Sequence, residues 1–212
     1  MQKIERQLDA GSLGLRAEIY LPDGASIQED QGNLCIRSEL PNGVGLLEMH
    51  GGDRMQVFLG LLQGLDGADA RGDVADEILA ALKADPRASM DRLSDIACQG
   101  HQALKCLVLE LDSGQQEDPD DYYLARVHAA GMPPLLLIDA GNYRIPTRSG
   151  IPLGISPDLE QPSQSLEWDR GGILHLHTEP VSNIDMETLH QGFIEFDPAA
   201  SNAEGLHIRL YA

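Results

Sequence analysis

One stretch, from residue 128 to residue 155, constrains the fold of this chain more than any other. It reads His-Ala-Ala-Gly-Met-Pro-Pro-Leu-Leu-Leu-Ile-Asp-Ala-Gly-Asn-Tyr-Arg-Ile-Pro-Thr-Arg-Ser-Gly-Ile-Pro-Leu-Gly-Ile. A turn of small residues leads into two prolines, and the apolar residues 135–138 then have the length of a short buried strand. The Ala-Gly-Asn at 140–142 is typical of a hairpin turn. The stretch therefore predicts short strands joined by tight turns.

Length and composition point to one soluble domain. At 212 residues the chain is long enough for a sizeable core, and we expect a single domain over 1–212. No segment approaches the ~20 apolar residues of a membrane span, and the N-terminus lacks the apolar stretch of a secretory signal. Cys35, Cys98 and Cys106 form no disulfide or metal pattern, so we expect buried free thiols. These absences favour a cytoplasmic protein.

The charge excludes some classes of partner. The formal net charge is −19, from 34 acidic and 15 basic residues. A nucleic acid or an anionic membrane would be repelled, and no cluster of Lys and Arg offsets this repulsion. We therefore expect neither as a partner.

Hydrophobic periodicity predicts many strands and one central pair of helices. Val74, Ile78 and Leu82 recur at helical spacing, so we expect a helix over 73–84, and Pro86 stops it. A second helix begins near Ser89 and ends at about residue 99, and a third covers 185–191. Strands are expected within the N-terminal region 1–32 and, by alternation and turn signals, over 13–21, 33–37, 44–49, 55–62, 104–111, 122–127, 135–138, 173–177 and 206–211.

Four segments of the chain resemble the SpoIIE family of bacterial metal-dependent Ser/Thr protein phosphatases (PPM, type 2C architecture). The stretch 128–155 resembles the family's Asn-Ala-Gly-His-x-Pro-Pro-Leu-Leu … Gly-x-Pro-Leu-Gly. Segment 57–67 resembles its strand and Asp-Gly loop, 107–112 its strand after the helix pair, and 166–180 its Leu-x-x-Gly-Asp-x-Leu-Leu-Leu-Tyr-Thr-Asp-Gly. The resemblance covers about residues 33–212. It implies an α/β (α+β) fold of four layers, an antiparallel β-sandwich flanked by helices.

The resemblance also implies a chemistry that depends on carboxylates. Family members bridge two Mg²⁺ or Mn²⁺ ions with aspartates from four places. These are a Gly-Asp in the first hairpin strand, an Asp-x-x-Gly-x-Gly loop, the Thr-Asp-Gly, and an Asp-Asp before the last strand. Hard cations need anionic oxygens, and a metal pair activates water and neutralises phosphoryl oxygens.

All four places look altered in this chain. The first falls within 44–48, where only Glu48 is acidic. A gap-free match puts Gln63 at the loop aspartate, whereas a slip of three residues puts Asp66 there, and both registers stay open. The third place reads Thr178-Glu179-Pro180, and the fourth falls at Ala203-Glu204. The candidate metal ligands are therefore Asp66, Glu179, Glu204 and Glu48, and no catalytic residue is assigned.

These substitutions argue against a standard dinuclear centre. The extra methylene of a glutamate displaces its carboxylate, which near-octahedral Mg²⁺ tolerates poorly. A glutamine offers one neutral oxygen, and Pro180 removes a backbone donor and the flexibility of a glycine. In the Asn-Ala-Gly-His segment, Ala129 and Met132 replace the Asn and the His.

Other groups of potential metal-binding or catalytic residues give weaker evidence of a site. His175 and His177 share one face of a strand and would bind a transition metal if a third ligand, His128 or a carboxylate, joined them. The favoured alternative is an outward strand face, with the neighbouring leucines inward. No Ser/His/Asp arrangement has a nucleophile-elbow motif, and the acidic loop 114–121 reads as a solvated hairpin tip.

Two functional hypotheses follow from the residues and the resemblance. The first is a SpoIIE-like phosphatase with impaired or absent catalysis, acting in sigma-factor or stress signalling on a phosphoprotein. It would use Mg²⁺ or Mn²⁺ if active, and no cofactor otherwise. The second is a pseudophosphatase, a binding module that docks a small regulatory protein. The residues favour the second slightly, and neither hypothesis specifies an oligomeric state.

Overall fold

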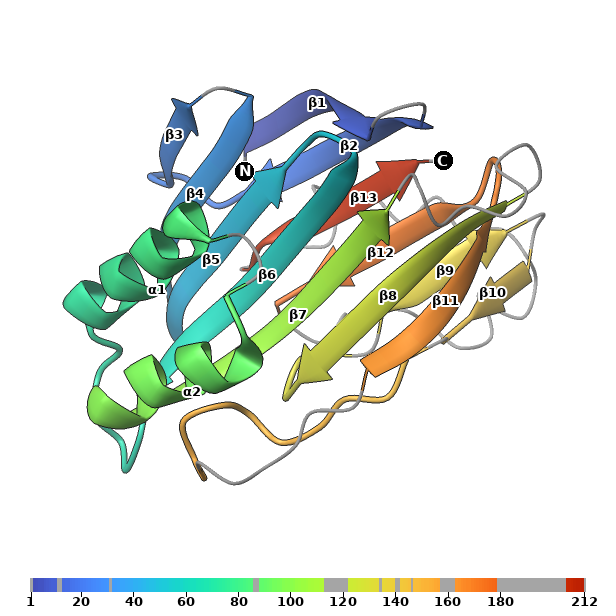
Figure 1. The fold of residues 1–212 in the computed structure, drawn as a ribbon. Coiled ribbons are helices and arrows are strands. Elements are labelled where there is room, and N and C mark those ends of the chain that lie inside the picture. Colours follow the sequence, from blue (N-terminus) through green and yellow to red (C-terminus); the bar gives the residue numbers. More distant parts are fainter. Residues whose placement is uncertain are drawn as a thin grey trace.

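The protein is built on two stacked antiparallel sheets (Figure 1). The computed structural model describes residues 2–10, 13–30, 32–85, 88–112, 122–133, 135–139, 142–145, 147–156, 163–178 and 205–211. Every statement on structure below concerns these residues.

The larger sheet has seven strands in the order β11-β8-β7-β6-β5-β4-β3, and every neighbouring pair is antiparallel. Its members are β3 (Ser26–Asp30), β4 (Asn33–Leu40), β5 (Gly43–His50), β6 (Arg54–Gly64), β7 (Gln102–Asp112), β8 (Tyr122–Ala130) and β11 (Ser163–Asp169). The strands predicted over 44–49 and 55–62 are confirmed as β5 and β6, which form an antiparallel pair with Glu48 opposite Phe58.

The smaller sheet has six strands in the order β1-β2-β13-β12-β9-β10, again antiparallel throughout. Its members are β1 (Gln2–Ala10), β2 (Leu13–Leu21), β9 (Leu136–Asp139), β10 (Asn142–Arg144), β12 (Ile173–His177) and β13 (His207–Tyr211). The last strand lies between β2 and β12, so the two ends of the described chain belong to one sheet.

Two helices, α1 (Gly72–Ala84) and α2 (Met90–Gln99), lie side by side on the outer face of the larger sheet (Figure 1). Both match the predicted helices to within a residue. The fold class predicted from the sequence is confirmed. The described residues supply three of the expected layers, and the predicted helix at 185–191 lies outside them.

Alternation along the central strands builds two cores. On β6, Val57 and Leu59 face the smaller sheet and join the core between the sheets, whereas Phe58 and Leu62 face the helices and join a second core. This double burial explains why β6 is apolar on both faces. On β5 the same alternation points Gly45 inward and Glu48 outward.

The start of α2 depends on one side chain. Ser89 has extended backbone angles, and its Oγ accepts a hydrogen bond of 3.2 Å from the backbone N–H of Arg92. The first backbone N–H groups of a helix have no partner within the helix, and this bond supplies one. We therefore expect Ser89→Ala to lower the free energy of unfolding by about 1 kcal/mol. Urea unfolding monitored by circular dichroism measures this change. Ser89→Asp keeps an acceptor at the position, so an equal loss in both variants would contradict the capping role.

Candidate functional site

The four segments that the resemblance assigns to metal binding meet at one end of the sandwich. In the larger sheet they are the start of β5 and the end of β6, where Val44 pairs with Leu62. In the smaller sheet they are the end of β12 and the start of β13. There the N–H of Thr178 donates to the Leu206 carbonyl (3.1 Å), and the N–H of Leu206 donates to Thr178 Oγ1 (3.0 Å). The fold therefore brings together positions that are far apart in the sequence.

Apolar side chains fill this end of the sandwich. A Cβ built on Gly45, which faces the smaller sheet, would lie 3.0 Å from Leu206 Cδ1 and 2.9 Å from Leu40 Cδ1. Both leucines are buried. Met132, at the place of the family's His, is buried in the core between the sheets, and Ala129 is buried as well.

The end of β6 offers no anionic ligand. Gln63 donates a hydrogen bond of 2.9 Å from Nε2 to the backbone carbonyl of Asn42. Gly64 comes so close to the next loop that a Cβ would overlap the backbone carbonyl of Ala68. Only glycine therefore fits at 64 while the loop keeps this path.

Asp66 is an exposed turn residue. With Gly67 it forms the centre of a turn in which the Ala68 N–H donates to the Leu65 carbonyl (3.0 Å), and the two central φ angles are 55° and 80°. Two positive φ angles identify a type I′ turn, for which Asp-Gly is a preferred pair. The turn explains Asp66 without a metal, and its role as a ligand stays a prediction.

Glu48 lies far from Asp66. It is 2% exposed, in the middle of β5, on the face that α1 covers. Its partner residue Phe58 is six residues before the end of β6, which is roughly 20 Å along the strand. Glu48 Oε1 lies 3.1 Å from His50 Nε2. Burial, followed by the charge of Glu48, raises the pKa of the neighbouring Cys35 thiol to about 12, so this cysteine is not a reactive thiolate.

Glu179 and Glu204, the other two predicted ligands, lie outside the described residues. Their described neighbours are Thr178 and Gly205, at the end of the sandwich where the four segments meet. Glu48 and Asp66 are thus the two candidates that the structure places, and it does not bring them together.

The described donor set does not fit a dinuclear Mg²⁺ or Mn²⁺ centre. Such a centre needs several anionic oxygens around one space. Near this end the described chain offers glycines, aliphatic side chains, the amides of Asn42, Gln63 and Gln102, and Thr178, whose hydroxyl already accepts a hydrogen bond. His177 and His207 pair at the same strand ends but face away from the core between the sheets. Throughout the described ranges, no group of three or more His, Cys, Asp and Glu side chains is placed to hold a metal ion.

The histidines of β12 have a different neighbour from the one considered in the sequence. His175 and His177 face away from the sandwich core, as expected, but the third imidazole beside them is His207 of β13. His175 Nδ1 lies 3.3 Å from His207 Nε2, and the rings of His177 and His207 are stacked at 5.9 Å. His128 lies on β8, in the other sheet.

Both central imidazoles are held neutral. His175 and His207 are only 3% and 2% exposed. Burial, with Arg209 and His177 adding to it, lowers the pKa of His175 to about 3. Burial and the two neighbouring histidines likewise hold the pKa of His207 well below its usual range. A neutral, tightly packed pair is a structural arrangement at neutral pH.

A buried carboxylate joins the two ends of the chain on the same face. Glu18 accepts hydrogen bonds from Lys3 Nζ (2.9 Å), Tyr20 Oη (3.1 Å) and Tyr211 Oη (2.7 Å). Burial alone would raise its pKa, but these donors outweigh burial and leave it at about 2. The sequence contained no signal for this cluster, because its members come from residues far apart in the chain. Its satisfied bonds indicate that it anchors β1 and β2 to the last strand.

Comparisons with known proteins agree with this geometry. Residues 73–205 match the family model of Stage II sporulation protein E (SpoIIE). A search of curated proteins gave no significant match.

Several solved structures have a similar fold. RsbX in complex with magnesium is 14% identical, with a TM-score of 0.55 over 88% of this chain and 98% of that one. The RsbU and RsbW domains of Rv1364c from Mycobacterium tuberculosis are 16% identical, with a TM-score of 0.55 over 98% of this chain and 61% of that one. The PP2C phosphatase domain of SpoIIE from Bacillus subtilis, with a fragment of its regulatory domain, is 13% identical, with a TM-score of 0.53 over 99% and 69%. At these identities the likeness shows the fold.

Proposed function

Because the chain belongs to the SpoIIE family of PPM-type protein phosphatases, we propose that it is a phosphatase-like domain whose metal-dependent catalysis is impaired or absent. We place it in a bacterial regulatory system, sigma-factor control or stress signalling. In this proposal the whole chain 1–212 forms one domain and acts in the cytoplasm.

One observation carries the proposal, namely the apolar filling of the end of the sandwich where the four segments meet. Leu206 and Leu40 contact the inward face of Gly45, and Gln63 and Gly64 stand at the loop position. In the family a metal pair would bind there and generate the attacking hydroxide.

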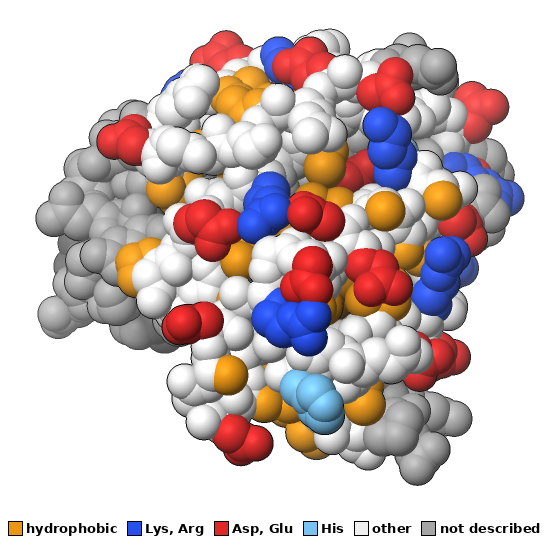
Figure 2. Space-filling model, turned by 90° about the vertical axis from the view of Figure 1, so that its left-hand side faces the viewer, with side chains coloured by type: hydrophobic (Ala, Val, Ile, Leu, Met, Phe, Trp, Pro, Cys, Tyr) orange, Lys and Arg blue, Asp and Glu red, His pale blue; other side chains and the backbone are white. Residues whose placement is uncertain are grey.

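A domain of this family without catalysis still has a partner-binding scaffold, and we favour this second role. The partner would be a phosphoprotein or a small regulatory protein. Figure 2 shows acidic side chains spread over the face with the helices, with single basic residues between them. A net charge of −19 together with such a surface disfavours nucleic acid. Among the described residues, no helix has the length and apolar character needed to cross a membrane.

Metal binding and turnover test the proposal directly. We expect titration calorimetry to show no micromolar Mn²⁺ site, because the described end of the sandwich has no set of anionic oxygens. We also expect hydrolysis of an aryl phosphate with Mn²⁺ to stay at background. A two-site isotherm that disappears in Asp66→Ala would overturn the proposal, as would turnover that requires Glu179 and Glu204. The matched control is Asp69→Ala, which removes an exposed carboxylate from the same loop.

A further inference from the structure

Strand β1 forms one edge of the smaller sheet (Figure 1). All nine of its residues pair with β2 in one continuous register, without a bulge. No strand in the described ranges pairs with its other side, and no backbone group of the described loops hydrogen-bonds to it. The N–H and C=O groups on that side therefore form a template to which another strand can add.

The basic side chains of β1 do not guard this edge. Charged side chains, lysine above all, commonly protect an edge strand against an incoming strand. On β1, however, Lys3 Nζ turns back over the sheet to Glu18 Oε1 of β2 (2.9 Å) and to Glu5 Oε1 (2.8 Å). Arg6 points to the other sheet, where it forms an ion pair with Glu29 of β3. Both cations are thus neutralised within one copy of the chain, and the edge backbone stays open.

The other three edge strands suit a second copy of the chain less well. β10 has three residues, and β3 and β11 carry two acidic residues each and no basic residue. Because the net charge of the chain is −19, two copies repel each other wherever acidic residues meet. The strand β1 has two basic and two acidic residues, so its own charge is zero: Lys3, Arg6, Glu5 and Asp9.

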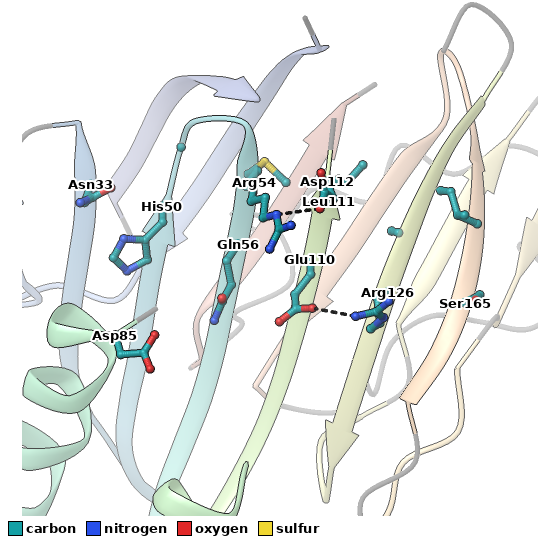
Figure 3. Close-up of a pocket in the computed structure, with 14 residues that line it drawn as sticks. Asn33, His50, Arg54, Gln56, Asp85, Glu110, Leu111, Asp112, Arg126 and Ser165 are labelled. Atoms are coloured by element: carbon teal, nitrogen blue, oxygen red, sulfur yellow. Dashed lines mark ion pairs between the residues drawn. The ribbon is translucent and has the colours of Figure 1, made fainter. Parts of the chain in front are cut away.

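The groove on the outer face of the larger sheet offers no comparable opening (Figure 3). It has a volume of about 660 Å³, but the strands β5 to β8 in its floor are paired on both sides. Its guanidinium groups already face carboxylates, because Arg54 Nε lies 2.7 Å from Asp112 Oδ2 and Arg126 Nη1 lies 3.9 Å from Glu110 Oε2. The charges of the groove therefore favour no class of partner.

The side chains of β1 select one register for a symmetric pair. Residues opposite each other in an antiparallel pair lie on the same face. With Ile4 on the two-fold axis, the two Ile4 side chains meet, and each Lys3 faces Glu5 of the second copy. Ile4 is half-buried and packs against the core between the sheets, so this pair extends the core across the edge. An axis at Glu5 or at Arg6 would instead bring two like charges together, which is unfavourable.

We propose that two copies of this chain associate edge to edge through β1, with Ile4 on the two-fold axis, so that their six-stranded sheets form one continuous sheet. The contact is isologous, because the same strand serves both copies. Backbone hydrogen bonds join the strands, and the side chains of Lys3, Ile4 and Glu5 set the register. The association uses neither a metal ion nor a phosphoryl group, and so it goes beyond the proposed function.

Sedimentation velocity of the full chain, from micromolar to millimolar concentration, tests the association. We expect a reversible dimer, and a chain that stays monomeric over this range would overturn the inference. In Glu5→Lys we expect the dimer to weaken roughly tenfold, because lysines then face each other on both sides of the axis. Glu77→Lys makes the same change of charge at an exposed position of α1 and should not weaken the dimer. Equal weakening in the two variants would contradict a contact through β1.

A disulfide tests the register independently. Opposite residues of an antiparallel pair have Cα atoms about 4.5–5.5 Å apart, which a disulfide can bridge. Mild oxidation of Ile4→Cys should therefore give a covalent dimer. The wild type and Gln7→Cys, which places the thiol at an exposed position beyond the paired segment, should not. Cross-linking of Gln7→Cys as fast as Ile4→Cys would overturn the inference, whereas the proposed function fails separately, through Mn²⁺ binding and turnover.

Discussion

Gly45→Asp is expected to destabilise the protein by about 3–5 kcal/mol relative to Gly45→Ala, the cost of placing a carboxylate in an apolar site. Position 45 faces the smaller sheet at the end of the sandwich, against Leu206 and Leu40. The family has an aspartate in this strand, so the substitution tests whether the space still receives an acidic group. Urea unfolding at neutral pH measures the difference.

Gly45→Ala is the control, because both substitutions introduce the same Cβ and only one introduces charge. The Cβ meets the ends of two flexible leucine side chains, so we expect the alanine variant to fold. If Gly45→Asp is as stable as Gly45→Ala and gains a Mn²⁺ site, the end of the sandwich is still a metal site, and our account of its apolar filling is wrong.

Stability is expected to fall by about 2–3 kcal/mol between pH 7.5 and pH 5.5. The pKa of His175 in the folded protein is about 3, and that of His207 is also well below its usual value of 6.5. The unfolded chain therefore binds more protons than the folded protein below about pH 6.5, and acid favours unfolding. Below about pH 6.5, each of the two histidines lowers the free energy of unfolding by about 1.4 kcal/mol for every pH unit of acidification. For His175 this loss continues down to about pH 3.

The pH difference itself is the quantity to compare between variants. His175→Gln removes one of the two groups and should reduce the difference by roughly half, whatever its effect on stability at pH 7.5. His128→Gln, in the other sheet, should leave the difference unchanged. A wild-type protein equally stable at both pH values would contradict the neutral, buried state of His175 and His207.

Local sequence patterns predicted the helices and most strands because these elements border a core on at least one face. Val74, Ile78 and Leu82 repeat at the period of a helix, and all three are buried against the larger sheet. The edge strand β3 lies in the N-terminal region where strands were expected, but its bounds were not predicted, because its side chains are mostly exposed and show no alternation of apolar and polar residues. Strand β11 was missed for a related reason, since only Leu166 and Trp168 of its seven residues are buried.

The sequence by itself determined the family and the fold class. Its resemblance to the family also predicted altered residues at the four metal-binding places, which stays a prediction. These properties can be read from the sequence because motifs are defined by the order and spacing of residues along the chain.

Only the tertiary structure decided which side chains meet at the end of the sandwich. Leu206 reaches Gly45 from the far end of the chain, and Glu18 gathers Lys3 and Tyr211 from opposite ends. It also separated Glu48 from Asp66 and placed Gln56 beside Glu110 and Asp85 in one groove. Such contacts depend on how strands distant in sequence pair and pack, and no local periodicity carries that information.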